Sequence, residues 1–238
     1  MGVDVGGTFT DVVLAAGDRL VVAKLLSTPG DYGQAIVEGT LAAAREAALE
    51  PASLGELVHG TTVATNAILE LKGARTGLLT TRGFRDLLEV RRMRVPRLYD
   101  PLWEKPRPLV ERRLRLEIDE RIDQTGAVLT PLDEGSVRDA VGRLLAEGVD
   151  AIAVCLLHSY RNPAHERRVG QIVRELAPGA YLSLSSEVWP QIREYERTST
   201  TVVNAYVGPV LASYLAALES RLAAARAHPR VLVMQSGG

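Results

Sequence analysis

A pair of glycines between two short apolar runs, close to the start of the chain, is the feature that most restricts the fold. Val3-Asp4-Val5 leads into Gly6-Gly7, and Thr10–Ala15 follows as a second β-prone run. Gly17-Asp18 then makes a turn before a third run at Leu20–Leu26. Strand, glycine turn, strand, turn and strand predict a β-meander. Because the glycines open into a strand, a ligand at their turn would be held by a β-hairpin.

The glycine turn has the composition of a phosphate-binding loop. Glycines let the backbone approach a ligand closely, and successive N–H groups can form a concave anion site. Thr8 and Thr10 add hydroxyl donors, while Asp4 and Asp11 are placed to hold a hydrated Mg²⁺ ion. Neither the P-loop pattern G-x-x-x-x-G-K-[ST] nor the dinucleotide pattern G-x-G-x-x-G occurs at this turn. The alternative is a tight hairpin turn flanked by capping threonines.

The remainder of the chain alternates between helical and strand patterns. A helical pattern covers residues 31–49, and further helices are expected after Thr61 or Thr62, over 133–147 and over 164–176. Apolar runs predict strands over 57–59, 76–80, 150–157, 181–185 and 230–235, with a half-exposed strand over 113–122. This order is typical of an α/β domain with a largely parallel sheet.

The C-terminal part has the pattern of one long helical stretch. Leu211, Leu215, Leu218 and Leu222 form a stripe at helical spacing, which predicts core packing. Pro209 is expected to mark a break in this helix or its start. A strand then runs directly into Ser236-Gly237-Gly238, where a turn or functional loop usually continues. We therefore expect the chain to be cut within a domain.

Composition argues against several classes of protein. The 28 basic and 29 acidic residues nearly cancel, so the chain has no global field to attract nucleic acid or an anionic membrane. Cys155 is the one cysteine and is expected to be buried, which excludes a disulfide framework and a thiolate zinc site. No signal peptide and no membrane helix of about 18 apolar residues are expected. A cytoplasmic protein without membrane or nucleic-acid partners is the expectation.

Six blocks of the sequence occur in the order found in one known family. They are DVGGTFTD at 4–11, HGTTVATNA at 59–67, GFRDLLE at 83–89, LHSYRNP at 157–163 followed by His165-Glu166, EYERTSTTVVNAY at 194–206, and MQS at 234–236. The chain resembles the hydantoinase A/5-oxoprolinase family, and its glycine turn resembles the first phosphate motif of the acetate and sugar kinase/Hsp70/actin superfamily. It departs from the family pattern at Gln191, usually glutamate, and at Ser236-Gly237-Gly238, usually Ser-Asn-Gly-Gly.

The resemblance implies a fold and a domain division. It implies an α/β, ribonuclease H-like or actin-like ATPase lobe, formed by the β-meander and strand–helix repeats. An inserted or appended α/β segment and a long C-terminal helix would complete the chain. Residues 1–178 would form the family's N-terminal α/β domain, and 179–238 the truncated start of its core domain.

The resemblance also implies a chemistry. Members use ATP, with Mg²⁺ or Mn²⁺, to phosphorylate the carbonyl oxygen of a cyclic amide such as 5-oxoproline or a hydantoin. A hydantoinase B-like subunit or a fused C-terminal domain then completes the reaction, so a hetero-oligomer is expected. Two alternatives remain open: an ATP-dependent carboxylase subunit acting on a ketone such as acetone, and a non-catalytic nucleotide-binding scaffold.

Residue chemistry and resemblance together single out the candidate site. Asp4, Asp11, Thr61 and Thr62 are assigned to catalysis, and Asp4 also holds the metal through water. Nucleotide binding is assigned to Gly6, Gly7, Thr8, Phe9, Thr10, His59, Gly60 and Asn66. Glu194 and Arg197 are assigned to the substrate, since arginine can clamp a carboxylate. The alternatives are a helix cap at Thr61 or Thr62, a hydrogen-bonded core or turn histidine at His59, and a structural charge at Glu194.

Overall fold

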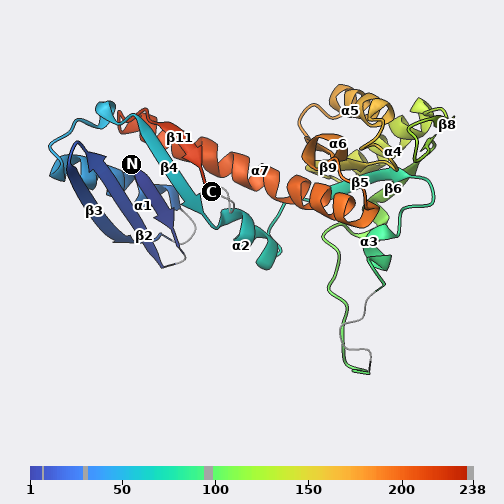
Figure 1. Cartoon of the computed structure of the whole chain (residues 1–238), viewed down its shortest axis with the longest axis horizontal. Coiled ribbons are helices and arrows are strands. Elements are labelled where there is room, and N and C mark those ends of the chain that lie inside the picture. Colours follow the sequence, from blue (N-terminus) through green and yellow to red (C-terminus); the bar gives the residue numbers. More distant parts are fainter. Residues whose placement is uncertain (7, 29–31, 94–98, 235–238) are drawn as a thin grey trace. The chain divides into compact units, whose positions relative to one another are not determined.

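The computed structural model describes residues 1–6, 8–28, 32–93 and 99–234. The chain divides into two compact units, both visible in Figure 1. Unit 1 combines Met1–Glu70 with Val210–Gly238, and unit 2 comprises Leu71–Pro209. The glycine turn and the His59 block therefore belong to unit 1.

Unit 1 is built on a five-stranded sheet with the order β11-β4-β1-β2-β3. The strands are β1 (Gly2–Val5), β2 (Phe9–Ala16), β3 (Arg19–Leu26), β4 (Glu56–Thr61) and β11 (Arg230–Val233). The first three pair antiparallel, which confirms the predicted meander, and β4 pairs parallel to both β1 and β11. The glycine turn therefore leaves the sheet from its central strand.

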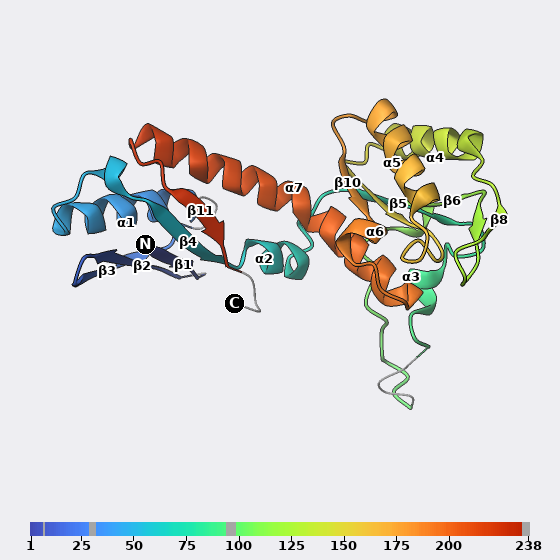
Figure 2. The same ribbon diagram turned by 45° about the horizontal axis from the view of Figure 1, so that its top comes forward.

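One face of this sheet forms the core of unit 1. Alternate residues of a strand point to opposite faces, so every second apolar residue can be buried. Helix α1 (Tyr32–Glu46) covers this face above β1, β2 and β3 (Figure 2), and η1 (Pro51–Ser53) and α2 (Val63–Leu69) flank β4. The buried set is Val3, Val5, Val12, Leu14, Val21, Ile36 and Leu57, with Leu218 and Leu222 from the C-terminal helix.

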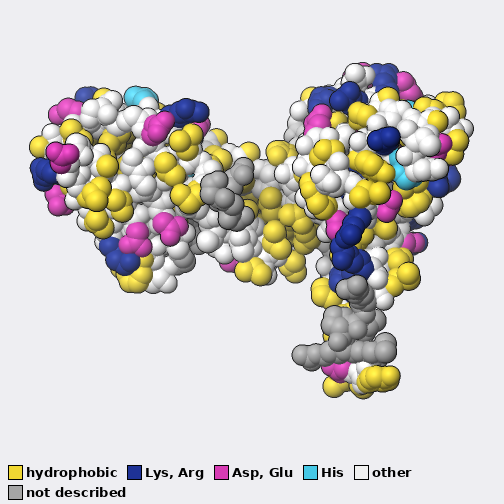
Figure 3. All heavy atoms as spheres, viewed as in Figure 1, with side chains coloured by type: hydrophobic (Ala, Val, Ile, Leu, Met, Phe, Trp, Pro, Cys, Tyr) yellow, Lys and Arg dark blue, Asp and Glu magenta, His cyan; other side chains and the backbone are white. Residues whose placement is uncertain are grey.

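The other face of the meander is open. Phe9, Val13 and Val22 are exposed there, and Figure 3 shows hydrophobic side chains among charged ones on the surface of unit 1. The same alternation that buries Val12 and Leu14 places Asp11 on this open face. The carboxylates of the glycine turn are therefore accessible rather than part of the core.

Unit 2 contains the predicted parallel sheet. Its order is β10-β9-β5-β6, and all three strand pairs are parallel. The strands are β5 (Thr76–Thr81), β6 (Arg115–Ile118), β9 (Ala151–Cys155) and β10 (Tyr181–Leu184); the other elements are α3 (Leu87–Val90), η2 (Arg112–Leu114), the hairpin of β7 (Arg121–Ile122) and β8 (Val128–Thr130), α4 (Glu134–Ala146), α5 (Ala164–Leu176) and α6 (Ser185–Val188). The expected α/β class is confirmed.

The segment 113–122 differs from the half-exposed strand expected for it. It forms η2, β6 and β7, and Leu114, Leu116 and Ile118 are buried together with Arg115. The Arg115 guanidinium donates through Nε and Nη2 to the Val110 carbonyl, and Nη2 also pairs with Glu89 at 2.9 Å. A charged residue in an alternating pattern was thus paired inside unit 2 instead of facing solvent.

Helix α7 (Glu194–Ala224) runs uninterrupted for 31 residues and contributes to both units. The expectation that Pro209 breaks or starts this helix was wrong, because Pro209 lies inside it. Val202 and Ala205 are anchored in the core of unit 2, and Leu218 and Leu222 in that of unit 1. Such burial on either side of a proline offsets the backbone hydrogen bond that the proline removes.

The same helix corrects the expectation about membrane helices. Residues 198–218 of α7 carry no charged side chain. Within the described part of the chain, α7 is the one helix long and apolar enough to cross a membrane by length and composition. A core helix of a soluble protein passes the same test, and α7 contributes buried side chains to the cores of both units.

The compact units of the structure are a different division from the family regions expected over 1–178 and 179–238. Strand β11 pairs with β4, and Leu218, Leu222 and Ala227 fill the core beneath the N-terminal strands. Residues 218–233 therefore belong to unit 1 together with the N-terminal strands. Strand β10, which the expected boundary would separate from β9, pairs with it in unit 2. Residues 71–209 form the inserted α/β segment.

Candidate functional site

The glycine turn connects β1 and β2 at one end of the unit 1 sheet. The Gly6 N–H donates to the Phe9 carbonyl at 3.0 Å, and a Cβ atom on Gly6 would lie 3.3 Å from that oxygen. The close approach explains why glycine suits position 6. Thr8 and Phe9 are exposed, and the Lys24 ammonium lies 4.9 Å from the centre of the Phe9 ring. Gly7 lies outside the described residues.

Asp4 and Asp11 lie side by side on the open face. Asp4 is the cross-strand partner of Asp11 on β2 and of Gly60 on β4. The Asp11 carboxylate is paired with Lys24 at 2.7 Å, whereas Asp4 makes no hydrogen bond or ion pair to any described residue. A Cβ atom on Gly60 would lie 2.9 Å from Asp4 Oδ1. Any residue larger than glycine at position 60 would therefore displace the Asp4 carboxylate. Of the two carboxylates, Asp4 is the one available to a ligand.

Thr10 does not lie where its assignment to phosphate requires. It is fully buried, and its Oγ1 lies 3.0 Å from Ser27 Oγ. The reason is the alternation of β2, which places residue 10 on the same inward face as Val12 and Leu14. The alternation was visible in the sequence and separates Thr10 from Phe9 and Asp11. Thr8 is exposed because it lies before β2, outside the strand.

The threonines of the HGTT block lie beside the glycine turn. Thr61 ends β4 and is the cross-strand partner of Val5, the residue before Gly6. Its Oγ1 accepts from the Val63 N–H at 3.2 Å. Thr62 precedes α2 without capping it, and its Oγ1 accepts from Asn66 Nδ2 at 3.4 Å. Since α2 has seven residues, the site offers these polar side chains rather than a strong helix dipole.

His59 is a structural residue of unit 1. It is buried, with Nε2 2.7 Å from the Tyr214 hydroxyl and Nδ1 3.4 Å from the Val3 carbonyl. Burial lowers the pKa of His59, against the raising effects of the Val3 hydrogen bond and the Asp4 charge. A neutral histidine that joins β1, β4 and α7 matches the alternative of a hydrogen-bonded core residue, not a direct nucleotide ligand.

We expect the stability of unit 1 to fall as the pH drops below 6.5. Because the pKa of His59 is lowered from 6.5 in the folded state, the unfolded chain takes up the proton first. The contribution of His59 is therefore complete above pH 6.5 and is lost as the pH falls through the folded pKa. Thermal melts of wild type and His59→Gln between about pH 5 and pH 8 measure it. Equal pH slopes for the two proteins would contradict this role.

Arg197 and Glu194 belong to unit 2, whereas the glycine turn belongs to unit 1. Arg197 is 1 % exposed, and its Nη1 and Nη2 donate to the carbonyls of Gln191 and Leu156, each at 2.9 Å. Two of the five guanidinium N–H groups are thus bound to backbone carbonyls, while the buried Nε has no hydrogen-bond partner among the described residues. Together with Glu194, Arg197 lines a cavity of about 10 Å³, room for about one water.

The LHSYRNP block with His165-Glu166 organises the carboxyl ends of the unit 2 strands. Glu166 is fully buried, and its Oε1 accepts from the Leu156 N–H at 3.1 Å and the Ser185 hydroxyl at 2.7 Å. Its Oε2 accepts from the Ser186 N–H at 2.6 Å. The sequence carried a signal for this role, since Glu166 shares the inward helical face of Val169 and Val173.

A second buried carboxylate joins the neighbouring strands of unit 2. Glu120 follows β6 and accepts from Thr81, at the end of β5, while His165 Nδ1 lies 2.8 Å from its other oxygen. The Thr81 hydroxyl in turn accepts from the Leu157 N–H at 2.9 Å. These hydrogen bonds satisfy both buried carboxylates. The residues of the LHSYRNP block with His165-Glu166 therefore have a structural role in unit 2.

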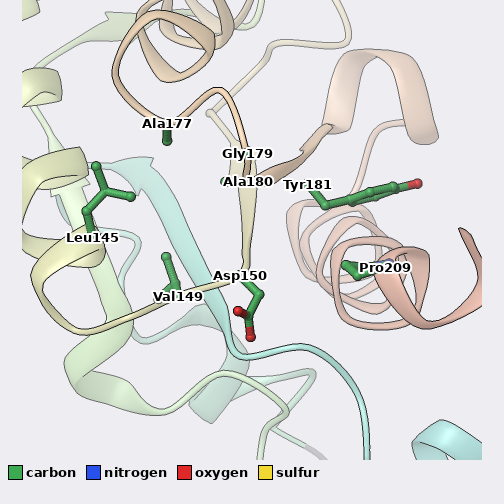
Figure 4. Close-up of a pocket in the computed structure, with 8 residues that line it drawn as sticks. All are labelled: Leu145, Val149, Asp150, Ala177, Gly179, Ala180, Tyr181 and Pro209. Carbon is green, nitrogen blue, oxygen red and sulfur yellow. The ribbon is translucent and has the colours of Figure 1, made fainter. Parts of the chain in front are cut away.

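Another cavity of unit 2 is shown in Figure 4. It measures about 580 Å³ and is lined by Leu145, Val149, Asp150, Ala177, Gly179, Ala180, Tyr181 and Pro209. Asp150 supplies the one carboxylate, and its Oδ2 accepts from the Arg75 N–H at 3.2 Å. Asp150 and Ala180 directly precede β9 and β10, so the cavity lies at the amino ends of the strands. Ligands of parallel sheets bind at the opposite, carboxyl ends.

Comparison with known proteins identifies relatives that match almost the entire chain. The caprolactamase subunit alpha of Pseudomonas jessenii is 38% identical over 245 residues, and the match covers 100% of this chain and 35% of the relative. The crystal structure of that ATP-dependent caprolactamase superimposes with a TM-score of 0.90 over 99% of this chain and 35% of that chain. The fold is that of an actin-like ATPase lobe.

Two further relatives have different printed activities. The acetophenone carboxylase gamma subunit of Aromatoleum aromaticum is 37% identical over 253 residues, covering 99% of this chain and 35% of the relative. The 5-oxoprolinase 1 of Arabidopsis thaliana is 33% identical over 267 residues, covering 99% of this chain and 21% of the relative. The chain thus spans about a third or less of the length of these relatives.

Two family models cover most of the sequence in succession. Residues 1–177 match the hydantoinase/oxoprolinase N-terminal region, and residues 197–238 match the hydantoinase/oxoprolinase domain. The chain belongs to the hydantoinase/oxoprolinase family.

Proposed function

We propose that the chain is the N-terminal, ATP-binding part of an enzyme that activates a cyclic amide by phosphorylating its carbonyl oxygen. The observation that carries the proposal is the position of the Asp4 carboxylate. It lies beside the glycine turn on the open face of the sheet and next to Gly60, whose missing side chain leaves room for it. Two of the relatives, caprolactamase and 5-oxoprolinase, are named for cyclic amides.

The chemistry needs little more from this chain than positioning and charge. An amide carbonyl is a poor electrophile because of resonance. Its oxygen would attack the γ-phosphorus of ATP, forming an O–P bond as the bond to ADP breaks, and the phosphate then becomes the leaving group. Phosphoryl transfer is catalysed mainly by orientation and by neutralising the phosphate charge.

The residues around the turn fit a hydrated divalent cation. Mg²⁺ or Mn²⁺ would take one carboxylate, Asp4, together with water and phosphate oxygens. Asp11 would act at a distance, because Lys24 already pairs with it. The Thr8 hydroxyl and the polar side chains of Thr61, Thr62 and Asn66 would face the phosphates.

The proposal includes a partner. A hydantoinase B-like subunit or a fused C-terminal domain would complete the reaction on the activated amide, in a cytoplasmic hetero-oligomer. Two relatives are named as subunits, and the chain covers 35% of each. Carboxylation of a ketone is the second candidate, since the acetophenone carboxylase subunit is 37% identical and the caprolactamase subunit 38%.

ATP hydrolysis by the enzyme assembled with its partner tests the proposal. We expect phosphate release to depend on a cyclic amide when 5-oxoproline, hydantoin, caprolactam and acetone with bicarbonate are supplied in turn. Stimulation by acetone with bicarbonate alone would favour the carboxylase candidate. Binding of ATP without turnover on any substrate would favour the non-catalytic scaffold.

A further inference from the structure

Ser27 forms two hydrogen bonds to the backbone of the glycine turn. It follows β3 directly and is 7 % exposed. Its hydroxyl donates to the Gly6 carbonyl at 2.7 Å, and its backbone N–H donates to the Thr8 carbonyl at 2.9 Å. One residue therefore binds the two carbonyls on either side of position 7.

The direction of the hydrogen bonds follows from the number of protons. A serine hydroxyl has one proton, and that of Ser27 is donated to Gly6. Thr10 Oγ1, 3.0 Å from Ser27 Oγ, must then be the donor of the pair. The result is a relay from the Thr10 hydroxyl through the Ser27 hydroxyl to the Gly6 carbonyl, and hydrogen bonds in such chains strengthen one another.

This arrangement suits a turn that receives phosphate. A carbonyl oxygen carries partial negative charge and would repel a phosphate that it faced. The carbonyls of Gly6 and Thr8 both accept hydrogen bonds from Ser27, so the partial negative charge of each oxygen is directed at a donor within the protein. Dipoles that are already oriented need no reorganisation when the charge arrives.

We infer that Ser27, with Thr10 as its donor, is a positioning residue for the phosphate-binding turn. The inference rests on the proposed function. It gives the buried Thr10 hydroxyl a role that does not require contact with the nucleotide. It also adds Ser27, which no block of family resemblance includes.

Kinetics of the assembled enzyme test the inference through Ser27→Ala and Thr10→Val. Loss of a donor to a buried acceptor corresponds to a change of about 5- to 150-fold in an equilibrium constant. We expect KM for Mg-ATP to rise by roughly tenfold or more in Ser27→Ala, and less in Thr10→Val, which keeps the bond to Gly6. Ser27→Thr retains the hydroxyl and should restore KM to near the wild-type value.

Thr40→Val is the matched control. Thr40 is a fully buried threonine on α1 of the same unit, and its hydroxyl has no partner among the described residues. Thr10→Val and Thr40→Val therefore make the same chemical change, but only one removes a hydrogen bond to the turn. Thr40→Val should leave KM unchanged.

Amide hydrogen exchange provides a readout independent of turnover. Exchange in a peptide containing Gly6 to Thr10 should accelerate in Ser27→Ala and not in Thr40→Val. Wild type that does not bind Mg-ATP would overturn the proposed function and this inference with it. Wild type that binds Mg-ATP, with the same KM and the same exchange in Ser27→Ala, would overturn the inference alone.

Discussion

Gly60→Ala is expected to lower substrate-dependent ATP hydrolysis by roughly a hundredfold while the protein stays folded. The added Cβ atom would meet Asp4 Oδ1 at 2.9 Å, closer than such contacts normally occur. Because the carboxylate is exposed and ends a short side chain, it can swing aside at little cost in stability. Its displacement by about 1 Å is enough for a loss of this size in a reaction that depends on orientation.

Two controls isolate this effect. Gly55→Ala adds a methyl group in the same unit where no heavy atom lies within 4 Å, and it should retain wild-type turnover. In an Asp4→Asn background, Gly60→Ala should cause little further loss, because the two changes act on the same carboxylate. Full additivity in the double variant, or normal turnover in Gly60→Ala, would show that Gly60 does not act through Asp4.

Glu166→Ala is expected to destabilise unit 2 by about 2–4 kcal/mol, since two buried donors and one half-buried donor lose their acceptor. A typical domain is stable by only about 5–15 kcal/mol. The melting temperature should therefore fall by on the order of 10 °C in calorimetry or circular dichroism. The loss would arise where β9 and β10 end, because Leu156, Ser185 and Ser186 follow these strands.

Glu175→Ala on the same helix is the comparison. Glu175 is exposed, and its partners are Arg138 and Arg168 on the surface. Exposed ion pairs contribute little, so the melting temperature should hardly change. A Glu166→Ala melting temperature close to that of Glu175→Ala would refute the role of Glu166 as a buried acceptor.

The order of elements could be predicted because it depends on local patterns. The meander followed from glycines between alternating runs, and the helix at 164–176 matches α5 residue for residue. The path of the last strand could not be predicted in this way. Strand β11 pairs with β4, far away in the sequence, and no local pattern encodes such a partner.

The candidate site was predictable to the level of blocks but not of individual side chains. Asp4 and Gly60 were named separately, and only the parallel pairing of β1 with β4 brings them together. Thr10 and His59 were grouped with the accessible residues although strand alternation turns both inward. The burial of Arg197 and its hydrogen bonds to backbone carbonyls could not be predicted, because such an arginine has no distinct sequence pattern.

The insertion of unit 2 within unit 1 also sets an order for synthesis on the ribosome. Residues 71–209 emerge as one continuous segment, so unit 2 has all its strands before β11 is made. During that interval β4 presents an unpaired edge, which is a template for wrong pairing with other chains. The pairing of β11 with β4 is therefore a late step in forming the sheet of unit 1, and it waits for the C-terminal part of α7 and for β11.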